Sequence, residues 1–331
     1  MPKVSVIVPC FNTGQYLDEA IHSVLNQTED DLEIIVVDDG STDPATVSLL
    51  AGYRRPRTRV LHTVHVGLAA ARNLGIAQAA GKYLCALDSD DRLEPSYLAK
   101  TTHVLDTDPS ATFVSAWLRT FGDETWEWKP ERCDLPVLLT EDTVLTSALV
   151  RRDAVIAAGG YDEQMPVQGD EDWDLWLTLV ERGGRGVILP EILFNYRRRP
   201  GSLSAVCWHG AGHVPLARYR INKHRDSYRA HLLDVLKEQD RHTSTLLRRN
   251  DSTERYLASE LEPALAGRRD ELVRLRRRLE RLVEKDERIS QLQTALQAAA
   301  AEATALRDSL SWRATGPLRR IYEWAWLRGR A

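Results

Sequence analysis

The chain has 331 residues, of which 43% are hydrophobic and 28% are charged, and its formal net charge is −4. These values are ordinary for a folded protein and allow one large domain with an appendage. Residues 312–331 hold five Arg and one Glu, about +4, which leaves about −8 for the remainder. An acidic body of this kind argues against nucleic-acid binding, and we expect no nucleic-acid partner.

Cysteine spacing and hydropathy set the expected compartment. The four cysteines are widely scattered with no CxxC pair, which argues against zinc or a disulfide framework and suits a reducing cytosol. The apolar run at 4–8 is followed by Pro9 and has no signal-peptide cleavage pattern. No apolar stretch approaches the roughly 20 residues that span a bilayer. We therefore expect a cytoplasmic protein, or one peripheral on the inner face of the cell membrane.

The first hundred residues alternate between short apolar runs and segments with helical spacing. The apolar runs predict buried strands at 4–8, 33–37, 59–63 and 83–87. The helical segments lie at 16–25, 44–52 and 68–79. Pro95 suits the first turn of a further helix that runs to about residue 105. This alternation predicts an α/β fold with a Rossmann-like, mostly parallel sheet flanked by helices.

The next hundred residues have a more mixed pattern. Residues 112–150 alternate like strands, so we expect a hairpin or a mixed-sheet insertion there. Helices are expected at 151–158 and 171–182. A strand pair at 186–189 and 192–197 should complete a domain that covers 1–205.

The chain beyond residue 205 changes character. We expect a helical linker at 206–260 and a coiled coil at 261–310, where apolar residues recur at three–four spacing. A dimer is the usual state of such a coil, and a single helix packed on the body is the alternative. The tail at 311–331 interleaves tryptophans with arginines, which suits either a membrane surface or docking on its own dimer.

Acidic residues directly follow the predicted strand 83–87. The chain there runs Asp88, Ser89, Asp90 and Asp91. One Asp could cap a helix, but three within four residues need another explanation. Open α/β sheets bind ligands at this edge, and a hard divalent cation carrying phosphate oxygens would offset the repulsion. One carboxylate would hold Mn²⁺ or Mg²⁺, and a neighbour would accept hydrogen bonds from a ribose.

A second acidic pair, Asp38 and Asp39, ends the second predicted strand and could accept the N–H of a base such as uracil. Pro9, Phe11 and Asn12 follow the first strand, where the backbone could border the base and the Phe11 ring could pack on it. A simple strand-to-helix turn would explain these three residues equally well.

Basic residues are available for the phosphates. Arg72 and Asn73 lie among small residues that permit close helix packing, and Arg72 could reach a phosphate or the acidic cluster. Arg197 opens a run of three arginines that could balance the charge of a departing diphosphate, or could form a solvated loop.

Glu171 and Asp172 begin a predicted helix whose dipole favours acidic residues. A group-transfer enzyme also needs a base near its acceptor hydroxyl. Either residue could serve, and we favour Asp172. Trp173 and Trp176 offer flat faces for a sugar.

Together these segments resemble a family 2 glycosyltransferase with the GT-A fold, of the type that assembles bacterial surface polysaccharides. The resemblance covers about residues 1–205 in order, through the motifs at 4–12, 37–43, 71–73, 87–91, 159–163, 171–172, 196–197 and 202–204. It implies a nucleotide-diphosphate sugar donor, with UDP-sugars favoured, a divalent cation, a saccharide or lipid-linked acceptor, and transfer with inversion. By position, Asp39 would contact the base, Asp90 or Asp91 would bind the metal, and Glu171 or Asp172 would be the base.

Three alternatives have different requirements. A sugar nucleotidyltransferase needs a glycine-rich triphosphate loop after the first strand, where Pro9, Cys10, Phe11 and Asn12 stand. A nicotinamide dehydrogenase needs GxGxxG at the same place, which is missing. A sugar-nucleotide-binding coiled-coil assembly protein with weak catalysis is the non-enzyme alternative, and the intact acidic groups argue against it.

Overall fold

The computed structural model describes residues 2–199 and 213–248, together with residues 273, 274, 298 and 301. One compact unit spans Met1–Thr243 and a second spans Ser244–Ala331. The expected coiled coil at 261–310 lies almost wholly outside the described residues, as do the tail at 311–331 and the motif at 202–204. The coil and the tail remain predictions.

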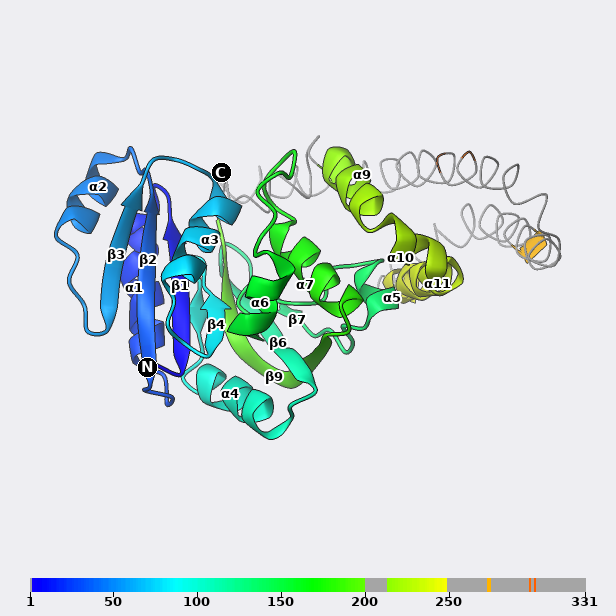
Figure 1. The fold of residues 1–331 in the computed structure, drawn as a ribbon, viewed down its shortest axis with the longest axis horizontal. Helices are drawn as coiled ribbons and strands as arrows, with labels where there is room; N and C mark the ends of the chain where they lie inside the picture. Colours follow the sequence, from blue (N-terminus) through cyan, green and yellow to red (C-terminus); the bar gives the residue numbers. More distant parts are fainter. Residues whose placement is uncertain (1, 200–212, 249–272, 275–297, 299–300, 302–331) are drawn as a thin grey trace, which may run out of the picture. The chain divides into compact units, whose positions relative to one another are not determined.

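A mixed sheet forms the centre of the first unit, in the order β3-β2-β1-β4-β8-β6-β9-β5 (Figure 1). Its first half is parallel and contains β1 (Val4–Cys10), β2 (Leu32–Asp39), β3 (Thr58–Thr63) and β4 (Tyr83–Ala86). Most of these side chains are buried because helices cover both faces of the sheet. The apolar runs predicted these four strands.

The second half of the sheet is largely antiparallel. β8 (Leu149–Arg151) joins β4 to β6 (Ala111–Gly122), and β7 (Glu127–Trp128) forms a hairpin with β6. The hairpin was predicted, but β6 lies in the main sheet rather than in an insertion. β9 (Arg185–Arg198) pairs in parallel with β6 and antiparallel with the short β5 (Arg92–Leu93).

The predicted strand pair at 186–189 and 192–197 is wrong, because both segments belong to β9. Ala116 of β6 pairs with Leu189, and the next residue, Trp117, pairs with Ile192. Two residues of β9, Pro190 and Glu191, therefore bulge out of the register. A bulge accommodates a proline that a regular ladder would exclude, and it interrupts the alternation without ending the strand.

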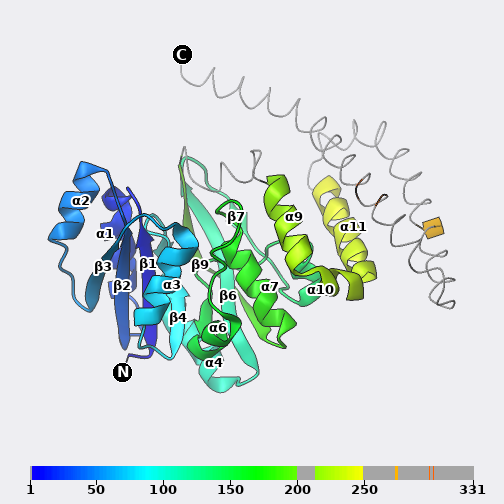
Figure 2. The same cartoon turned by 45° about the horizontal axis from the view of Figure 1, so that its top comes forward.

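Successive residues of a strand point to opposite faces of the sheet, and helices cover both faces. One apolar core contains Val4, Val6 and Val8 with α1 and α4, and the other contains Ile7 with α3, α6 and α7 (Figure 2). The helices before residue 200 are α1 (Gly14–Leu25), α2 (Pro44–Ala51), α3 (Leu68–Gln78), α4 (Tyr97–Thr107), α5 (Leu135–Leu138), α6 (Arg152–Ala158) and α7 (Glu171–Glu181).

Helix α4 begins two residues later than expected, at Tyr97, with Ser96 as its N-cap. Pro95 therefore precedes the helix instead of occupying its first turn. The described part of the chain contains no helix with the length and apolarity needed to cross a bilayer.

Within the described range 213–248 lie three further helices: α9 (His213–Lys223), α10 (Arg225–Ala230) and α11 (Leu232–Arg248). The first compact unit extends to Thr243, so α9, α10 and most of α11 belong to it. The expected boundary at residue 205 lies inside this unit. Lys223 at the end of α9 and His224 directly after it contact Asp174 of α7, which the linker prediction did not anticipate.

Candidate active site

The parallel strands bring the predicted acidic groups to one edge of the sheet. Cys10 at the end of β1 pairs with Asp38 at the end of β2. Ile7 pairs with Ala86, the last residue of β4, so the segment 88–91 continues from the neighbouring strand. Carboxyl ends of parallel strands share an edge, and this edge is where ligands bind in open α/β sheets.

Asp38 and Asp39 are both buried and already hold protein groups. The backbone N–H of Ser41 donates to Asp38 Oδ1 at 3.0 Å, and His62 Nδ1 lies 2.9 Å from Asp38 Oδ2. Burial alone would raise the pKa of Asp38, but the hydrogen bonds from His62 and Ser41 hold it below the ordinary value. Asp38 therefore holds the turn that follows β2.

Asp39 supports the loop that enters α3. Its Oδ1 accepts the N–H of Val66 at 2.7 Å, and its Oδ2 accepts the N–H of Gly67 at 3.1 Å. His65 Nδ1 lies 2.9 Å from the same Oδ2. Both histidines at this edge, His62 and His65, were absent from the predicted site, because a lone His in a strand or loop carries no motif.

Of the residues that follow β1, Phe11 is exposed, whereas Asn12 has a structural role. The Phe11 ring is 39% exposed and stacks on His65. The Asn12 side chain instead binds the loop after β2: its Oδ1 accepts the N–H groups of Thr42 at 2.7 Å and Asp43 at 2.8 Å. Pro9 lies within β1, opposite Val37. Of these three predicted base contacts, Phe11 alone offers an open side-chain surface.

Arg72 connects the two acidic segments. It lies on α3 and is 1% exposed, and its guanidinium donates to Asp88 Oδ1 at 2.8 Å and to Glu171 Oε1 at 2.6 Å. Burial would lower the pKa of Arg72, but the charges of Asp88 and Glu171 raise it above the ordinary value. The sequence left open whether Arg72 would reach a phosphate or the acidic cluster, and the structure pairs it with Asp88 and with Glu171.

Asn73, the next residue, serves a loop rather than the acidic edge. Its Nδ2 donates to the carbonyl of Tyr161 at 2.8 Å, and its Oδ1 accepts the N–H of Tyr161 at 2.8 Å. Gly160 has a φ of +80°, and a Cβ there would lie 2.5 Å from Asn73 Oδ1. The close approach explains why this loop carries glycine before Tyr161.

The segment 88–91 places its four side chains differently. The Ser89 hydroxyl lies 2.7 Å from that of Thr13, which joins the segment to the loop after β1. Asp91 is 2% exposed, and its Oδ1 accepts the backbone N–H of Arg197 at 2.7 Å. Burial and the charges of Asp90 and Asp88 raise the pKa of Asp91 well above its ordinary value. Asp91 thus fixes β9 to this segment.

Asp88 and Asp90 have the donor chemistry of a site for Mg²⁺ or Mn²⁺. Asp88 bonds Arg72 through Oδ1, and Arg199 Nε donates to Asp90 Oδ2 at 2.7 Å. Burial and the charge of Asp88 raise the pKa of Asp90, as expected where negative charge is incompletely balanced. Among the described residues, no three or more His, Cys, Asp or Glu side chains are grouped to hold a metal. Carboxylates completed by substrate phosphates and water fit this arrangement better than a full protein cage.

Arg197 closes the same edge from β9. Its Nε donates to the carbonyl of Asp90 at 2.8 Å, and another nitrogen lies 2.7 Å from Glu19 Oε2. Its guanidinium also lies over the rings of Tyr16 and Phe121. These contacts hold Arg197 as part of the protein scaffold, so the positive charge is fixed close to the acidic segment.

Glu171 and Asp172 have separate environments although they are adjacent. Glu171 uses both oxygens: Oε1 accepts from Arg72, and Oε2 accepts the N–H of Gly169 at 2.7 Å. Asp172 accepts the hydroxyl of Thr146. Burial, followed by the charge of Glu171, raises the pKa of Asp172 to about 7. A carboxylate with this pKa has the proton affinity that suits a general base at neutral pH.

Three residues near Asp172 were missed by the sequence reasoning. Thr146 and Asp142 precede β8, and burial and the charge of Asp172 raise the pKa of Asp142 well above its ordinary value. Arg220 of α9 is buried, pairs with Asp170, and lies 3.3 Å from the centre of the Trp173 ring. They stand far from Asp172 in sequence and in no motif, so no local signal marked them.

The two tryptophans expected to face a sugar are core residues. Trp176 is 0% exposed and packs against Phe113, with ring centres 5.1 Å apart. Trp173 is buried, and its indole N–H donates to the carbonyl of Leu138 at 2.6 Å. The expectation is wrong because these side chains point from α7 into the apolar core shared with the sheet.

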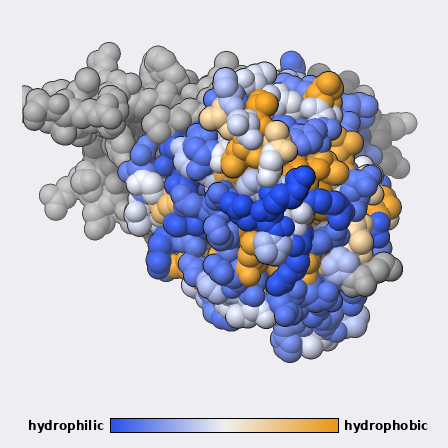
Figure 3. Space-filling view, turned by 90° about the vertical axis from the view of Figure 1, so that its left-hand side faces the viewer, coloured by the Kyte–Doolittle hydropathy of each residue, from blue (hydrophilic) through white to orange (hydrophobic). Residues whose placement is uncertain are grey.

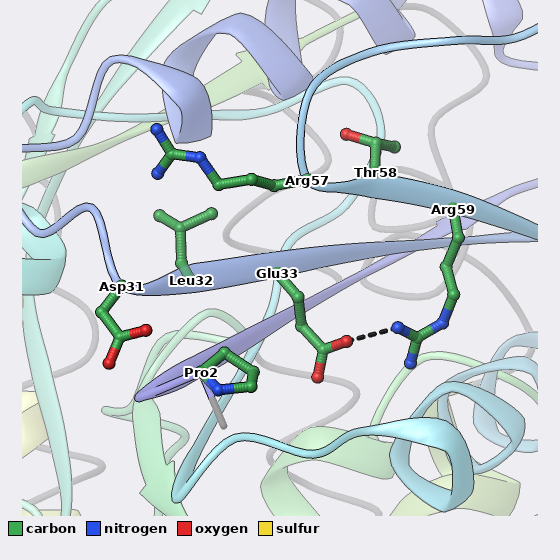
Figure 4. Close-up of a pocket in the computed structure, with 7 residues that line it drawn as sticks. All are labelled: Pro2, Asp31, Leu32, Glu33, Arg57, Thr58 and Arg59. Carbon is green, nitrogen blue, oxygen red and sulfur yellow. Dashed lines mark hydrogen bonds and ion pairs between the residues drawn. The ribbon is translucent and has the colours of Figure 1, made fainter.

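A hollow of about 530 Å³ lies at a different place, near the start of β2 and β3 (Figure 4). It is lined by Pro2, Asp31, Leu32, Glu33, Arg57, Thr58 and Arg59. Glu33 and Arg59 are ion-paired across it. Strands β2 and β3 run parallel, so this hollow lies at the amino-terminal edge and contains none of the predicted site residues.

Comparisons with known proteins identify the family of the chain. The pattern described as Glycosyl transferase family 2 matches residues 5–160. TuaG of Bacillus subtilis (strain 168), named for teichuronic acid biosynthesis, is 30% identical over 217 residues, 63% of this chain and 84% of TuaG. EpsH of the same organism, named as a glycosyltransferase, is 38% identical over 126 residues, 38% of this chain and 32% of EpsH.

Solved structures show the same fold. The S. aureus TarS 1-349 structure in complex with UDP-GlcNAc matches with a TM-score of 0.52 at 21% identity, over 61% of this chain and 60% of that one. The sheet and its flanking helices have the GT-A fold. The chain belongs to glycosyl transferase family 2 and resembles enzymes of bacterial polysaccharide synthesis.

Proposed function

We propose that this enzyme transfers a sugar from a UDP-sugar to a hydroxyl acceptor, with the help of a divalent cation and with inversion at the anomeric carbon. The observation that carries the proposal is the Arg72 bridge. One buried guanidinium bonds both Asp88, beside the candidate metal site, and Glu171, beside the candidate base. The leaving group and the acceptor would therefore meet within one small region of the sheet edge.

The donor nucleotide would lie along the ends of β1, β2 and β4. Phe11 offers a ring face for the base, and Asp39 offers carboxylate oxygens for an N–H. Asp88 and Ser89 would accept or donate hydrogen bonds to the ribose. The relatedness to TarS, which is known in complex with UDP and with UDP-GlcNAc, supports a uridine nucleotide.

Asp90 would hold the Mn²⁺ or Mg²⁺, because Asp91 is buried against β9. When bound, the cation would stabilise negative charge on the departing diphosphate. Arg197 and Arg199 keep positive charge beside Asp90 from the opposite side. We therefore narrow the earlier choice between Asp90 and Asp91 to Asp90.

Asp172 would remove the proton from the acceptor hydroxyl, and Glu171 would hold the start of α7 in place. The raised pKa of Asp172 suits proton removal near neutral pH. Glu171 is paired with the buried guanidinium of Arg72, whose positive charge stabilises the ionised carboxylate, so Glu171 has less capacity to take a proton. Attack opposite the leaving diphosphate inverts the configuration of the anomeric carbon.

The acceptor would be a saccharide or a lipid-linked saccharide used in surface polysaccharide or glycoconjugate assembly. The relationship to TuaG, whose name refers to teichuronic acid biosynthesis, supports this class. Dimerisation through 261–310 and membrane contact through 311–331 would keep the enzyme at the inner face of the membrane, as the sequence of those segments suggests.

The proposal is tested with the full chain and a panel of UDP-sugars in the presence of Mn²⁺, with UDP release and glycosylated product measured together. We expect product from at least one donor, and a loss of about 10²-fold or more in Asp172→Asn. UDP binding should survive that substitution. Donor binding without transfer to any of a broad set of acceptors would favour the assembly-protein alternative.

A further inference from the structure

His65 makes the two contacts that the proposed function assigns to the nucleotide base. Its ring stacks on Phe11, with centres 4.1 Å apart and planes inclined by 20°. Its Nδ1 lies 2.9 Å from Asp39 Oδ2 and 3.1 Å from the backbone carbonyl oxygen of Asp39. A planar heterocycle that stacks on an aromatic ring and places a ring nitrogen against the oxygens of Asp39 has the recognition chemistry of uracil.

We propose that the imidazole of His65 occupies the position of the donor base and must swing out before a nucleotide binds there. The inference rests on the proposed function, which assigns Phe11 and Asp39 to the base. It makes His65 a further determinant of nucleotide affinity, acting by competition for one ring face and one carboxylate.

The surroundings of His65 allow its side chain to move while the backbone stays in place. The His65 side chain is 51% exposed, in the loop between β3 and α3. That loop is anchored separately, because Asp39 accepts the backbone N–H groups of Val66 and Gly67. Rotation of the imidazole would thus free the Phe11 face without removing the loop from Asp39.

The exposed character of this loop supports a mobile side chain. Val64 is 75% exposed and Val66 is 44% exposed on either side of His65. The face of the molecule over β3 and α2 is mainly hydrophilic with scattered hydrophobic side chains (Figure 3). His65 is thus flanked by exposed residues, and its contacts with Phe11 and Asp39 are the ones to be exchanged for those of a base.

With competition of this kind, the apparent Kd for the nucleotide equals the intrinsic Kd divided by the fraction of molecules whose site is open. Replacing His65 by alanine removes the competitor, so nucleotide affinity should rise. His62 supplies a matched control. Its side chain is 54% exposed and its Nδ1 lies 2.9 Å from Asp38 Oδ2, but it stacks on no ring among the described residues.

The test is isothermal titration of the full chain with UDP at saturating Mn²⁺, comparing wild type, His65→Ala and His62→Ala. We expect His65→Ala to lower the Kd for UDP about fivefold or more, since it removes one charge-assisted hydrogen bond and one stack that compete with the base. His62→Ala should change the Kd by less than about twofold. His65→Phe keeps a ring on Phe11 without the N–H, and its Kd should fall between those of wild type and His65→Ala.

The opposite outcomes are distinct. A higher Kd for UDP in His65→Ala means that the base stacks on His65 as a platform. An unchanged Kd means that the His65 ring does not affect UDP binding. Either result overturns the inference while UDP binding by the wild type leaves the proposed function standing. If neither the wild type nor His65→Ala binds UDP, the assignment of a UDP-sugar donor fails and this inference fails with it.

Discussion

Arg72 and Glu171 form a buried ion pair with a nitrogen–oxygen distance of 2.6 Å, although they are 99 residues apart in the sequence. The same guanidinium bonds Asp88 at 2.8 Å. Helix α3 thereby fixes the relative positions of the end of β4 and the start of α7. Arg72 is thus a structural link between the candidate metal site and the candidate base.

Arg72→Met should strongly destabilise the protein. It leaves Glu171 buried without its cation, and breaking a buried pair costs about 3–5 kcal/mol. Arg59→Met is the matched control, because Arg59 pairs with Glu33 at the opposite edge of the sheet and is largely exposed. That pair should contribute no more than about 1 kcal/mol. Urea unfolding of both variants gives the comparison, and equal losses would contradict the central role of Arg72.

Transfer activity should rise with pH through the pKa of Asp172, which is about 7. The base acts in its deprotonated form, so kcat should be low at about pH 5 and reach a plateau above about pH 8. Asp172→Asn should lose about 10²-fold or more, whereas Glu171→Gln should affect stability together with activity. A pH profile without this rising limb would exclude Asp172 as the base.

The same raised pKa predicts an effect on stability. The folded state binds a proton at Asp172 more tightly than the unfolded state does, so this stabilising contribution is lost as pH rises towards about 7. Asp172→Asn removes the penalty of a buried negative charge. Its Tm should exceed that of the wild type at about pH 8, and the difference should shrink towards about pH 4. Thermal unfolding at several pH values measures both, and a lower Tm of the variant at the higher pH would count against this prediction.

Substitution of Asp90 should affect metal binding, whereas substitution of Asp91 should affect the stability of the protein. Asp90→Ala should abolish the Mn²⁺ dependence of UDP binding while the protein stays folded. Asp91→Ala leaves the backbone N–H of Arg197 without its acceptor and should cost about 1–3 kcal/mol of stability. Calorimetric UDP titrations with and without Mn²⁺, combined with unfolding curves, distinguish the two. Loss of Mn²⁺ dependence in Asp91→Ala alone would reverse the assignment.

Arg220 should affect catalysis more than donor binding. It pairs with Asp170 and lies on Trp173, the residues on either side of Glu171 and Asp172. Arg220→Met should lower kcat about tenfold or more through misplacement of the base, with little change in the Kd for UDP. Lys223→Met is the control on the same helix, since Lys223 pairs with Asp162 and Asp174 instead. Equal losses of kcat in both variants would indicate a general effect of α9.

The parallel half of the fold was readable from the sequence because β1, β2 and β4 are mainly buried apolar runs, and acids end or follow β2 and β4. The bulge at Pro190 and Glu191 divided β9 into two apparent strands, since periodicity cannot distinguish a bulge from a turn. The contacts of α9 were hidden for another reason. They are long-range charge pairs, such as Lys223 with Asp174, and long-range pairs leave no periodic pattern.

The sequence predicted which residues belong to the site, but it did not show which of them hold the protein together and which are open to a ligand. Spacing alone could not show that Asp91 is buried against Arg197, or that the Asn12 amide is engaged by Thr42 and Asp43. Trp176 was expected to face a sugar because the sequence of an aromatic residue beside an acidic motif is the same whether the ring is exposed at a binding site or buried in the core. Only burial separates these cases.

The most direct measurement is a crystal structure of the full chain with UDP and Mn²⁺, with the metal located by its anomalous signal. We predict a metal peak bound to Asp90 and to the diphosphate, with the base on Phe11 and the Asp172 carboxylate facing the open side of the phosphate. Nucleotide density elsewhere, with the edge formed by Asp88 and Asp90 empty of metal, would contradict the account.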